Sequence, residues 1–144
     1  MTRLHTFWIL AALSLTVSTA LADDAVERAV TGLRAEHGLS QLSENEALQL
    51  AATAHAEDML RHRYFSHNGR DGSTVADRVN RAGYRWCYVA ENIAQGQKDL
   101  YEVMSAWAQS PGHRANLLSS RVREFGLAAG SGYIWVLVLA ARDC

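Results

Sequence analysis

The chain has 144 residues, 14 of them basic and 15 acidic, which gives a formal net charge of −1. A chain of this length suits one domain and can bury roughly two thirds of its surface. The near-zero charge excludes a dedicated nucleic-acid binder, because such proteins have a strong basic excess.

Residues 1–22 are typical of a secretory signal peptide. Arg3 supplies a positive start, residues 7–17 form an apolar core, and small residues precede a cut after Ala22. An uncleaved membrane anchor is disfavoured, because the apolar run is shorter than the roughly 20 residues that a spanning helix needs. We therefore expect a protein exported to the periplasm or the cell exterior, with one domain at residues 23–144 and no membrane span.

Both cysteines, Cys87 and Cys144, follow the predicted signal peptide. In an oxidising compartment an even count of two indicates one disulfide, which would close a long loop and stabilise the fold by about 4 kcal/mol. A zinc thiolate site from two such distant cysteines is a weaker alternative, and no CxxC motif supports a redox function. We predict a structural disulfide.

Two long helices are predicted in the first half of the domain. Residues 24–37 have apolar side chains at helical spacing and end at Gly38, where a helix-terminating glycine belongs. Residues 44–63 form the second helix, because Ser43 and Glu46 have the spacing of a capping box and an apolar stripe follows them.

Three histidines of these helices are given no central function. His55 lies on the apolar stripe of the second helix, so we interpret it as a buried structural histidine. His62 faces either the site or solvent, and His37 is an exposed helix end.

The middle of the chain alternates breaks and short elements. Residues 64–69 form a loop with two aromatic residues and a turn signal, and His67 lies in it. A short helix is predicted at residues 74–82. Residues 84–89 are aromatic and β-branched, which favours a strand or an extended segment.

Asp99 and Glu102 have capping-box spacing and predict the start of another helix, whose apolar stripe we assign to the core. Pro111, the only proline, ends that helix and begins a short one with Ser110 as its cap. His113 then lies in the first turn, where a helix N-terminus disfavours imidazolium, so we expect it to be neutral.

Two β-like runs end the chain, at residues 124–129 and 133–140, and a Gly-Ser-Gly turn predicts a hairpin between them. The second run is apolar on both faces, so it should be a central strand covered on both sides. Helices followed by a doubly covered sheet predict an α+β fold with three layers.

His67, Glu91 and His113 stand at the ends of predicted elements or between them, where side chains often face clefts. If they converge, they can bind a metal ion or perform acid–base chemistry. The surrounding arginines form either a solvated face with local ion pairs, which we favour, or a surface for an anionic cell-envelope polymer. These arginines are Arg61, Arg63, Arg70, Arg78, Arg81, Arg85 and Arg114.

Several motifs in order resemble the bacterial, SCP-like extracellular branch of the CAP superfamily, which includes cysteine-rich secretory proteins, antigen 5 and plant pathogenesis-related proteins. The resemblance extends over nearly all of residues 23–144 and implies an α-β-α sandwich with a small, mainly antiparallel central sheet. The matching segments are Leu48 through Met59, Phe65-Ser66-His67, Glu91-Asn92-Ile93, Trp107-x-x-Ser110-x-x-His113-Arg114-x-Asn116-Leu117, and Phe125-Gly126 with the final strand.

The resemblance also implies a cleft with two histidines and two acids, which binds zinc or another divalent cation in some members. By motif, His67 and His113 match the histidines and Glu91 matches one acid. Ser110 stands where the second acid is expected, and Ala90 replaces the usual glycine before Glu91. This departure lowers the expected metal affinity and weakens a carboxylate-assisted mechanism.

Three functions therefore stay open. The cleft binds a small ligand, a peptide or a cell-envelope polymer, with or without a divalent ion, which we favour. Alternatively, His67 and His113 hold a metal and Glu91 is the base of a peptidase-like hydrolase. Glu91 could instead only hydrogen-bond a histidine and fix its tautomer, which would make a rigid polar floor of the cleft. In the third hypothesis the constellation is a structural remnant. Enzyme activity stays open, because Ser66 and Ser110 are better explained as turn and cap residues than as nucleophiles.

Overall fold

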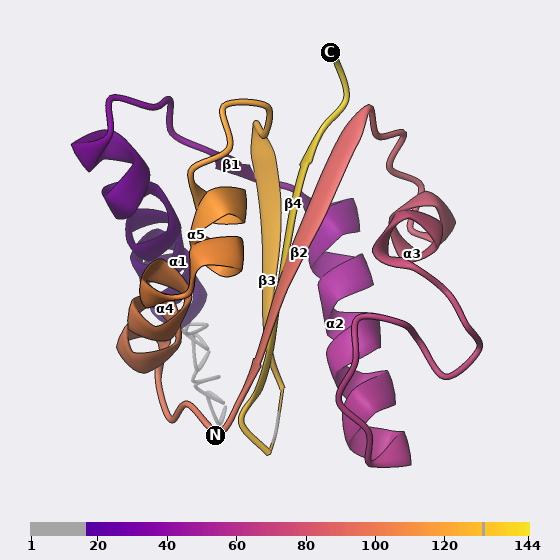
Figure 1. The fold of residues 1–144 in the computed structure, drawn as a ribbon. Helices are drawn as coiled ribbons and strands as arrows, with labels where there is room; N and C mark the ends of the chain where they lie inside the picture. The colour runs from indigo at the N-terminus through magenta and orange to yellow at the C-terminus, as the bar shows by residue number, and fades with distance from the viewer. Residues whose placement is uncertain (1–16, 131) are drawn as a thin grey trace, which may run out of the picture.

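A computed structural model describes residues 17–130 and 132–144 and shows a central sheet with helices on both faces (Figure 1). α1, α4 and α5 cover one face, and α2 and α3 cover the other, which confirms the predicted α+β, three-layer arrangement. The elements in chain order are α1 (Val17–Glu36), β1 (Ser43–Glu44), α2 (Glu46–His62), α3 (Val75–Arg81), β2 (Tyr88–Gln95), α4 (Leu100–Gln109), α5 (Pro111–Leu117), β3 (Glu124–Gly130) and β4 (Ile134–Ala141).

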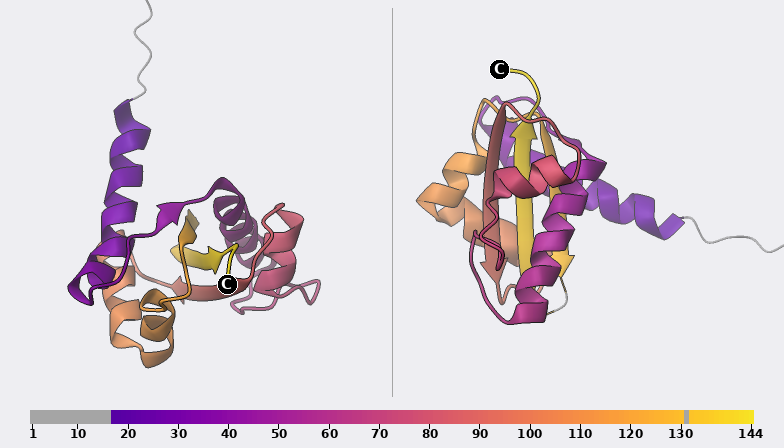
Figure 2. Two further views of the ribbon diagram at one scale, coloured as in Figure 1. Left: turned by 90° about the horizontal axis from the view of Figure 1, so that it is seen from above. Right: turned by 90° about the vertical axis from the view of Figure 1, so that its right-hand side faces the viewer.

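The predicted signal peptide falls mostly outside the described residues, which begin at position 17. The first helix begins at Val17 rather than at Asp24 as expected, and no proline interrupts it before Glu36. Figure 2 shows the first turns of α1 extending beyond the rest of the domain. Within the described part of the chain, no helix has the length and hydrophobicity that crossing a bilayer requires.

The sheet has the strand order β1-β3-β4-β2. β4 pairs antiparallel with both β2 and β3, whereas the short β1 runs parallel to β3. All eight residues of β4 are buried, which confirms the predicted central strand covered on both faces. The predicted hairpin is confirmed by the antiparallel pairing of β3 with β4.

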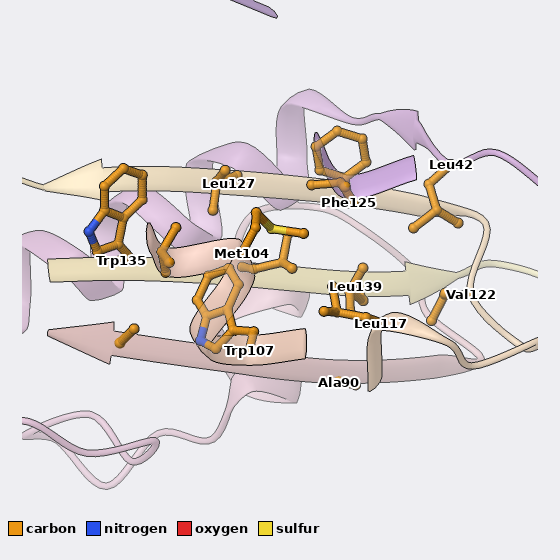
Figure 3. Close-up of a cluster of buried hydrophobic side chains, with 14 residues drawn as sticks. Leu42, Ala90, Met104, Trp107, Leu117, Val122, Phe125, Leu127, Trp135 and Leu139 are labelled. Carbon is orange, nitrogen blue, oxygen red and sulfur yellow. The ribbon is translucent and has the colours of Figure 1, made fainter. Parts of the chain in front are cut away.

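Alternate residues of the strands contribute to two separate cores, as the two-residue period of a strand requires. On the α1/α4/α5 side, Trp107, Phe125 and Trp135 are the largest members of the cluster in Figure 3. On the other side, Met59 of α2 and Tyr84 pack against Val136 and its β4 neighbours. β2 follows the same alternation, so its successive side chains meet opposite faces of the sheet.

Side-chain capping follows the sequence signals at α3 and α4 but not at α2. Thr74 and Asp77 form the expected capping box of α3, and the Asp99 side chain accepts the Glu102 N–H at the start of α4. The prediction for α2 was wrong: Ser43 belongs to β1, and the Asn45 side chain caps the helix instead. Asn45 follows directly on the β1–β3 pairing, so long-range strand pairing overrides the local capping-box signal.

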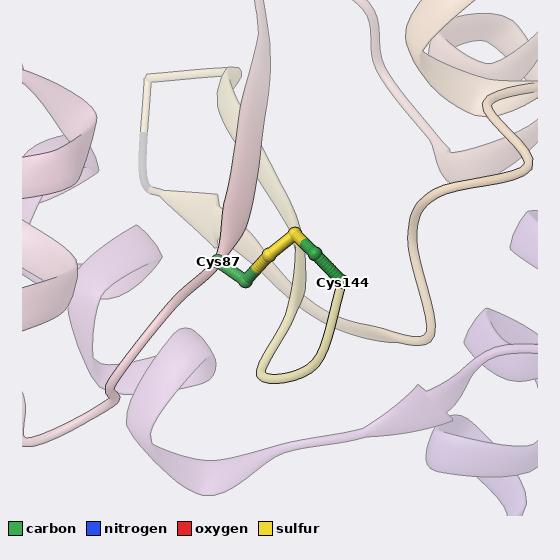
Figure 4. Close-up of a disulfide and its surroundings, with 2 residues drawn as sticks. All are labelled: Cys87 and Cys144. Carbon is green, nitrogen blue, oxygen red and sulfur yellow. A yellow bond between two sulfur atoms is a disulfide. The ribbon is translucent and has the colours of Figure 1, made fainter.

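The predicted disulfide is confirmed between Cys87 and Cys144, whose Cα atoms lie 5.9 Å apart (Figure 4). It links the segment before β2 to the end of the chain, beside the pairing of Tyr88 with Ala141. With a sequence separation of 57, the cross-link is worth about 4 kcal/mol in the chain-entropy treatment. The disulfide therefore fastens the strand that bears Glu91 to the central strand.

Candidate functional site

The site is built on β2, where Glu91 and Asn92 are consecutive and both buried. Consecutive residues of a strand point to opposite faces. Glu91 meets the layer of α2 and α3, and Asn92 meets the layer of α5. The sequence analysis placed Glu91 at the end of an element or between elements, and this was wrong, because Glu91 lies inside β2. The extended segment starts as a strand only at Tyr88 and continues past Glu91, because it pairs with β4 over its whole length.

Both oxygens of the Glu91 carboxylate are engaged. Oε1 lies 2.8 Å from Nδ1 of His67, and Oε2 accepts a hydrogen bond of 2.7 Å from Nη2 of Arg78. Only 2% of the Glu91 side chain is exposed, whereas 56% of the His67 side chain is exposed. A carboxylate can only accept when ionised, so His67 donates from Nδ1 and presents Nε2 to the surroundings.

Arg78 is the residue that sequence reasoning missed. It was expected on a solvated face, yet it is buried, and it also donates to the carbonyl oxygens of Ser73 and His67 at 2.9 and 3.0 Å. Arg78 therefore fixes the loop backbone that holds His67. A signal was present in the sequence: with Val75 and Val79, Arg78 lies on the i, i+3, i+4 stripe that faces the core.

His55 is buried, as predicted, and lies behind Glu91. Its Nε2 is 2.9 Å from the Ser66 carbonyl oxygen and 4.0 Å from Glu91 Oε1. Burial is the largest cause of its lowered pKa, and the positive charge of Arg78 acts in the same direction. His55 is consequently neutral at pH 7, with its proton on Nε2, since a carbonyl only accepts.

His113 approaches the site from α5 and is half-buried. Its Nδ1 lies 3.0 Å from the Ser110 hydroxyl, and its carbonyl oxygen accepts from Asn92 at 3.1 Å. Ser110 takes the predicted cap position, but its side chain bonds His113 instead of the helix backbone. The pKa of His113 is lowered as expected, although burial and then the charge of His67 are the causes.

The structure thus joins His67 directly to Glu91, and it joins His113 to the adjacent Asn92 through a backbone contact. His62 instead pairs with Asp58 at 2.8 Å, and His37 lies on the surface near Arg114. Within residues 17–130 and 132–144, no group of three or more His, Cys, Asp or Glu side chains has an arrangement that could hold a metal ion.

Comparison with known proteins gives one consistent family. The family CAP, cysteine-rich secretory protein, matches residues 27–139. The uncharacterized protein YkwD of Bacillus subtilis is 34% identical over 125 residues, which are 83% of this chain and 49% of YkwD. The uncharacterized membrane protein YlbC of Bacillus subtilis is 31% identical over 101 residues, 70% of this chain and 29% of YlbC. The chain therefore spans about half or less of these relatives.

Two solved structures have the same fold. An extracellular protein containing an SCP domain from Bacillus anthracis superposes with a TM-score of 0.78 at 25% identity, over 83% of this chain and 40% of that protein. An outer surface protein of Borrelia burgdorferi superposes with a TM-score of 0.74 at 20% identity, over 91% of this chain and 97% of that protein. The family match, the relatives and the shared fold confirm the family that the sequence resembles, and the chain belongs to the CAP, or cysteine-rich secretory protein, family.

Proposed function

We propose that this protein is an exported CAP-domain binding protein whose cleft at His67, Glu91 and His113 binds a small ligand or peptide without transforming it. The observation that supports this most is the engagement of both Glu91 oxygens, by His67 and by Arg78. A general base must accept a proton from a substrate or a bound water. A buried carboxylate already paired with a guanidinium is poorly placed to do so.

What remains available in the cleft suits recognition. With Nδ1 of His67 hydrogen-bonded to Glu91, Nε2 points away from the carboxylate and is open to a polar group of a ligand. The half-buried His113 ring, held by Ser110 and lying 6.5 Å from the Trp107 ring centroid, adds a second fixed surface. Side chains fixed by neighbours lose little entropy on binding, which favours a preorganised binding cleft.

A metal-dependent hydrolase is the second candidate, and one contact favours it. A histidine whose Nδ1 donates to a carboxylate is the usual arrangement behind a metal-bound imidazole, and His67 has it with Glu91. The site has too few metal ligands, however. Catalytic zinc sites use three protein ligands, and Glu91 is committed elsewhere, which leaves only His67 and His113. The residues present do not fit a three-ligand zinc site.

Zinc titration by calorimetry on the purified, oxidised protein tests these two functions. We expect no tight binding, because two imidazoles alone hold zinc weakly. A matched His67→Ala/His113→Ala variant is the control. Binding near one equivalent that this double substitution abolishes would favour the hydrolase, and peptidase assays with Glu91→Gln would then follow. Loss of a general base lowers the rate by about 10² or more.

The location is proposed on separate grounds. Residues 1–22 have the composition of a signal peptide, and the disulfide between Cys87 and Cys144 fits an oxidising compartment. N-terminal sequencing of the protein recovered outside the cytoplasm should begin at Asp23. Recovery of full-length protein in the membrane fraction would indicate an uncleaved anchor instead.

A further inference from the structure

A second candidate site lies beside the one at His67, Glu91 and His113. A cavity of about 780 Å³ lies between α2, residues 69–73 and α3, and we call it the α2–α3 groove. His67, Glu91 and His113 do not line it, but His55 and Arg78, which flank Glu91, do. The size is within the range of small-ligand sites.

Small apolar side chains line part of the groove. Ala51 and Ala54 of α2 and Ala82 after α3 contribute methyl groups, and Leu50 is 56% exposed there. A large apolar side chain left this exposed beside a cavity is a favourable contact for the apolar part of a ligand. The small alanine side chains leave space beside Leu50 for apolar side chains of a ligand.

Two buried nitrogens of the groove residues lack a hydrogen-bond partner: Nδ1 of His55 and Nε of Arg78. Because Nε2 of His55 donates to the Ser66 carbonyl, Nδ1 of the neutral ring is an acceptor without a donor. Nε–H of Arg78 is a donor without an acceptor. Unpaired buried polar groups are uncommon and each costs free energy, so a ligand that pairs both gains binding energy. A secondary amide offers the required N–H and C=O together.

Among the residues that the structure describes, the acidic side chains around the groove are paired, whereas one of its arginines is not. Asp71 pairs with Arg81 at 2.7 Å, and Asp58 bonds His62 and Tyr64. The guanidinium of Arg70, which also lines the groove, is exposed and pairs with no acidic side chain among the described residues. A free arginine beside an amide-binding pair favours a ligand that carries a carboxylate.

We propose that the α2–α3 groove binds the carboxyl-terminal end of a short peptide with small apolar side chains. The terminal carboxylate meets Arg70, an amide meets Nε of Arg78 and Nδ1 of His55, and the side chains rest on Leu50 and the alanines. Because these two nitrogens are buried in the free protein, binding requires the side chains that cover them to move, while His55 and Arg78 keep their hydrogen bonds to Ser66 and Glu91. The proposal does not depend on the function of the cleft.

Nuclear magnetic resonance titration of the ¹⁵N-labelled, oxidised protein with N-acetyl-alanyl-alanine is the test. We expect saturable shift changes at the amides of Ala51, Ala54, Gly69 and Ser73 at millimolar peptide. The matching peptide carboxamide should bind about fivefold more weakly, as should the free acid to Arg70→Gln, the effect of one exposed ion pair. Arg70→Gln should bind the carboxamide as the wild type does.

Two variants control this experiment. Arg61→Gln removes an exposed arginine of α2 that does not line the groove, and it should bind the free acid normally. Ala54→Glu places a charged side chain in the groove at an exposed helical position, and it should abolish binding while the protein stays folded. Absent shifts, equal binding of acid and carboxamide, or unchanged binding by Ala54→Glu would overturn the proposal. Shift changes confined to His67, Glu91 and His113 would overturn it as well and would support the cleft instead.

Discussion

Each of the two faces of β2 at the site buries one polar side chain, but the two side chains are stabilised by different chemistry. Glu91 on one face is buried as an ion, held by Arg78 at 2.7 Å and by His67 at 2.8 Å. Asn92 on the other face is fully buried but neutral, and it bonds Asn116 at 2.8 Å and the His113 carbonyl oxygen at 3.1 Å. The charged face stabilises only while it is complete, because an unpaired buried charge costs far more than an unpaired amide.

Loss of Arg78 is the largest effect that this comparison predicts. Arg78→Leu keeps an apolar stem on the inner stripe of α3 but leaves the buried Glu91 carboxylate without its guanidinium. We expect the free energy of unfolding in urea to fall by about 3–5 kcal/mol. Adding Glu91→Leu should recover part of that loss, because the unpaired charge is then gone.

Arg81→Leu is the matched control for that variant. Arg81 lies one turn further along α3 and also pairs with a carboxylate at 2.7 Å, but both partners are more than half exposed. Its loss should change the unfolding midpoint little. If Arg78→Leu and Arg81→Leu were equally destabilised, burial of the ion pair would not explain the effect of losing Arg78.

Much of this arrangement could be predicted from the sequence. The apolar runs, capping residues and motifs predicted the three layers, the central β4 and the buried His55. The pairing of Cys87 with Cys144 followed from their number and the expected compartment. These features depend on local periodicity or on one constraint along the chain.

The contacts that complete the site could not be predicted in the same way. Glu91 lies inside a strand because β2 pairs with β4, which comes much later in the chain and places Val138 opposite Glu91. Asn45 rather than Ser43 caps α2 because β1 pairs with β3. The engagement of Arg78 depends on the backbone carbonyls of Ser73 and His67 and on the carboxylate of Glu91, which come together only in the folded chain. Spacing along the chain placed Arg78 on the inner stripe, but it could not show which acid would meet it.

On the neutral face, removing Asn92 should have a smaller effect. Asn92→Ala removes the hydrogen bonds to His113 and Asn116 without leaving a buried charge, so we expect a loss of about 1–3 kcal/mol in urea unfolding. Asn116→Ala, at a half-buried position, is the control and should lose less. A loss for Asn92→Ala equal to that of Arg78→Leu would contradict the proposed difference between the faces.

The charged face should also respond to pH through His55. Burial lowers the pKa of His55 below its ordinary value of 6.5. Just below pH 6.5, His55 therefore binds a proton in the unfolded chain but not in the folded state. Stability should therefore fall as the pH drops below about 6.5, by at most about 1.4 kcal/mol per pH unit from this residue, until the folded pKa is reached.

Urea unfolding at a series of pH values measures this dependence, with His55→Gln as the variant. Glutamine can still donate to the Ser66 carbonyl but does not titrate, so the fall in stability should become shallower. Some dependence should remain, because the pKa of His113 is lowered too. His37→Gln, at an exposed histidine on the other layer, is the control. If the dependence of stability on pH were unchanged in His55→Gln, His55 would not be the group whose lowered pKa causes it.

The smallest effect on stability is expected at His67, which lies on the charged face but at its exposed end. In His67→Ala the Glu91 carboxylate keeps Arg78, and more than half of the lost side chain was already in solvent, so stability should fall by less than about 1 kcal/mol. His67→Asn is the companion variant, because its amide can still donate to Glu91 without supplying an imidazole. A binding cleft requires that His67 contribute little to stability and be retained for what its free Nε2 recognises. Thermal unfolding could instead show that His67→Ala loses as much stability as Arg78→Leu and that His67→Asn restores it. His67 would then have a structural function, and the cleft would be a structural remnant, which would contradict the proposed binding function.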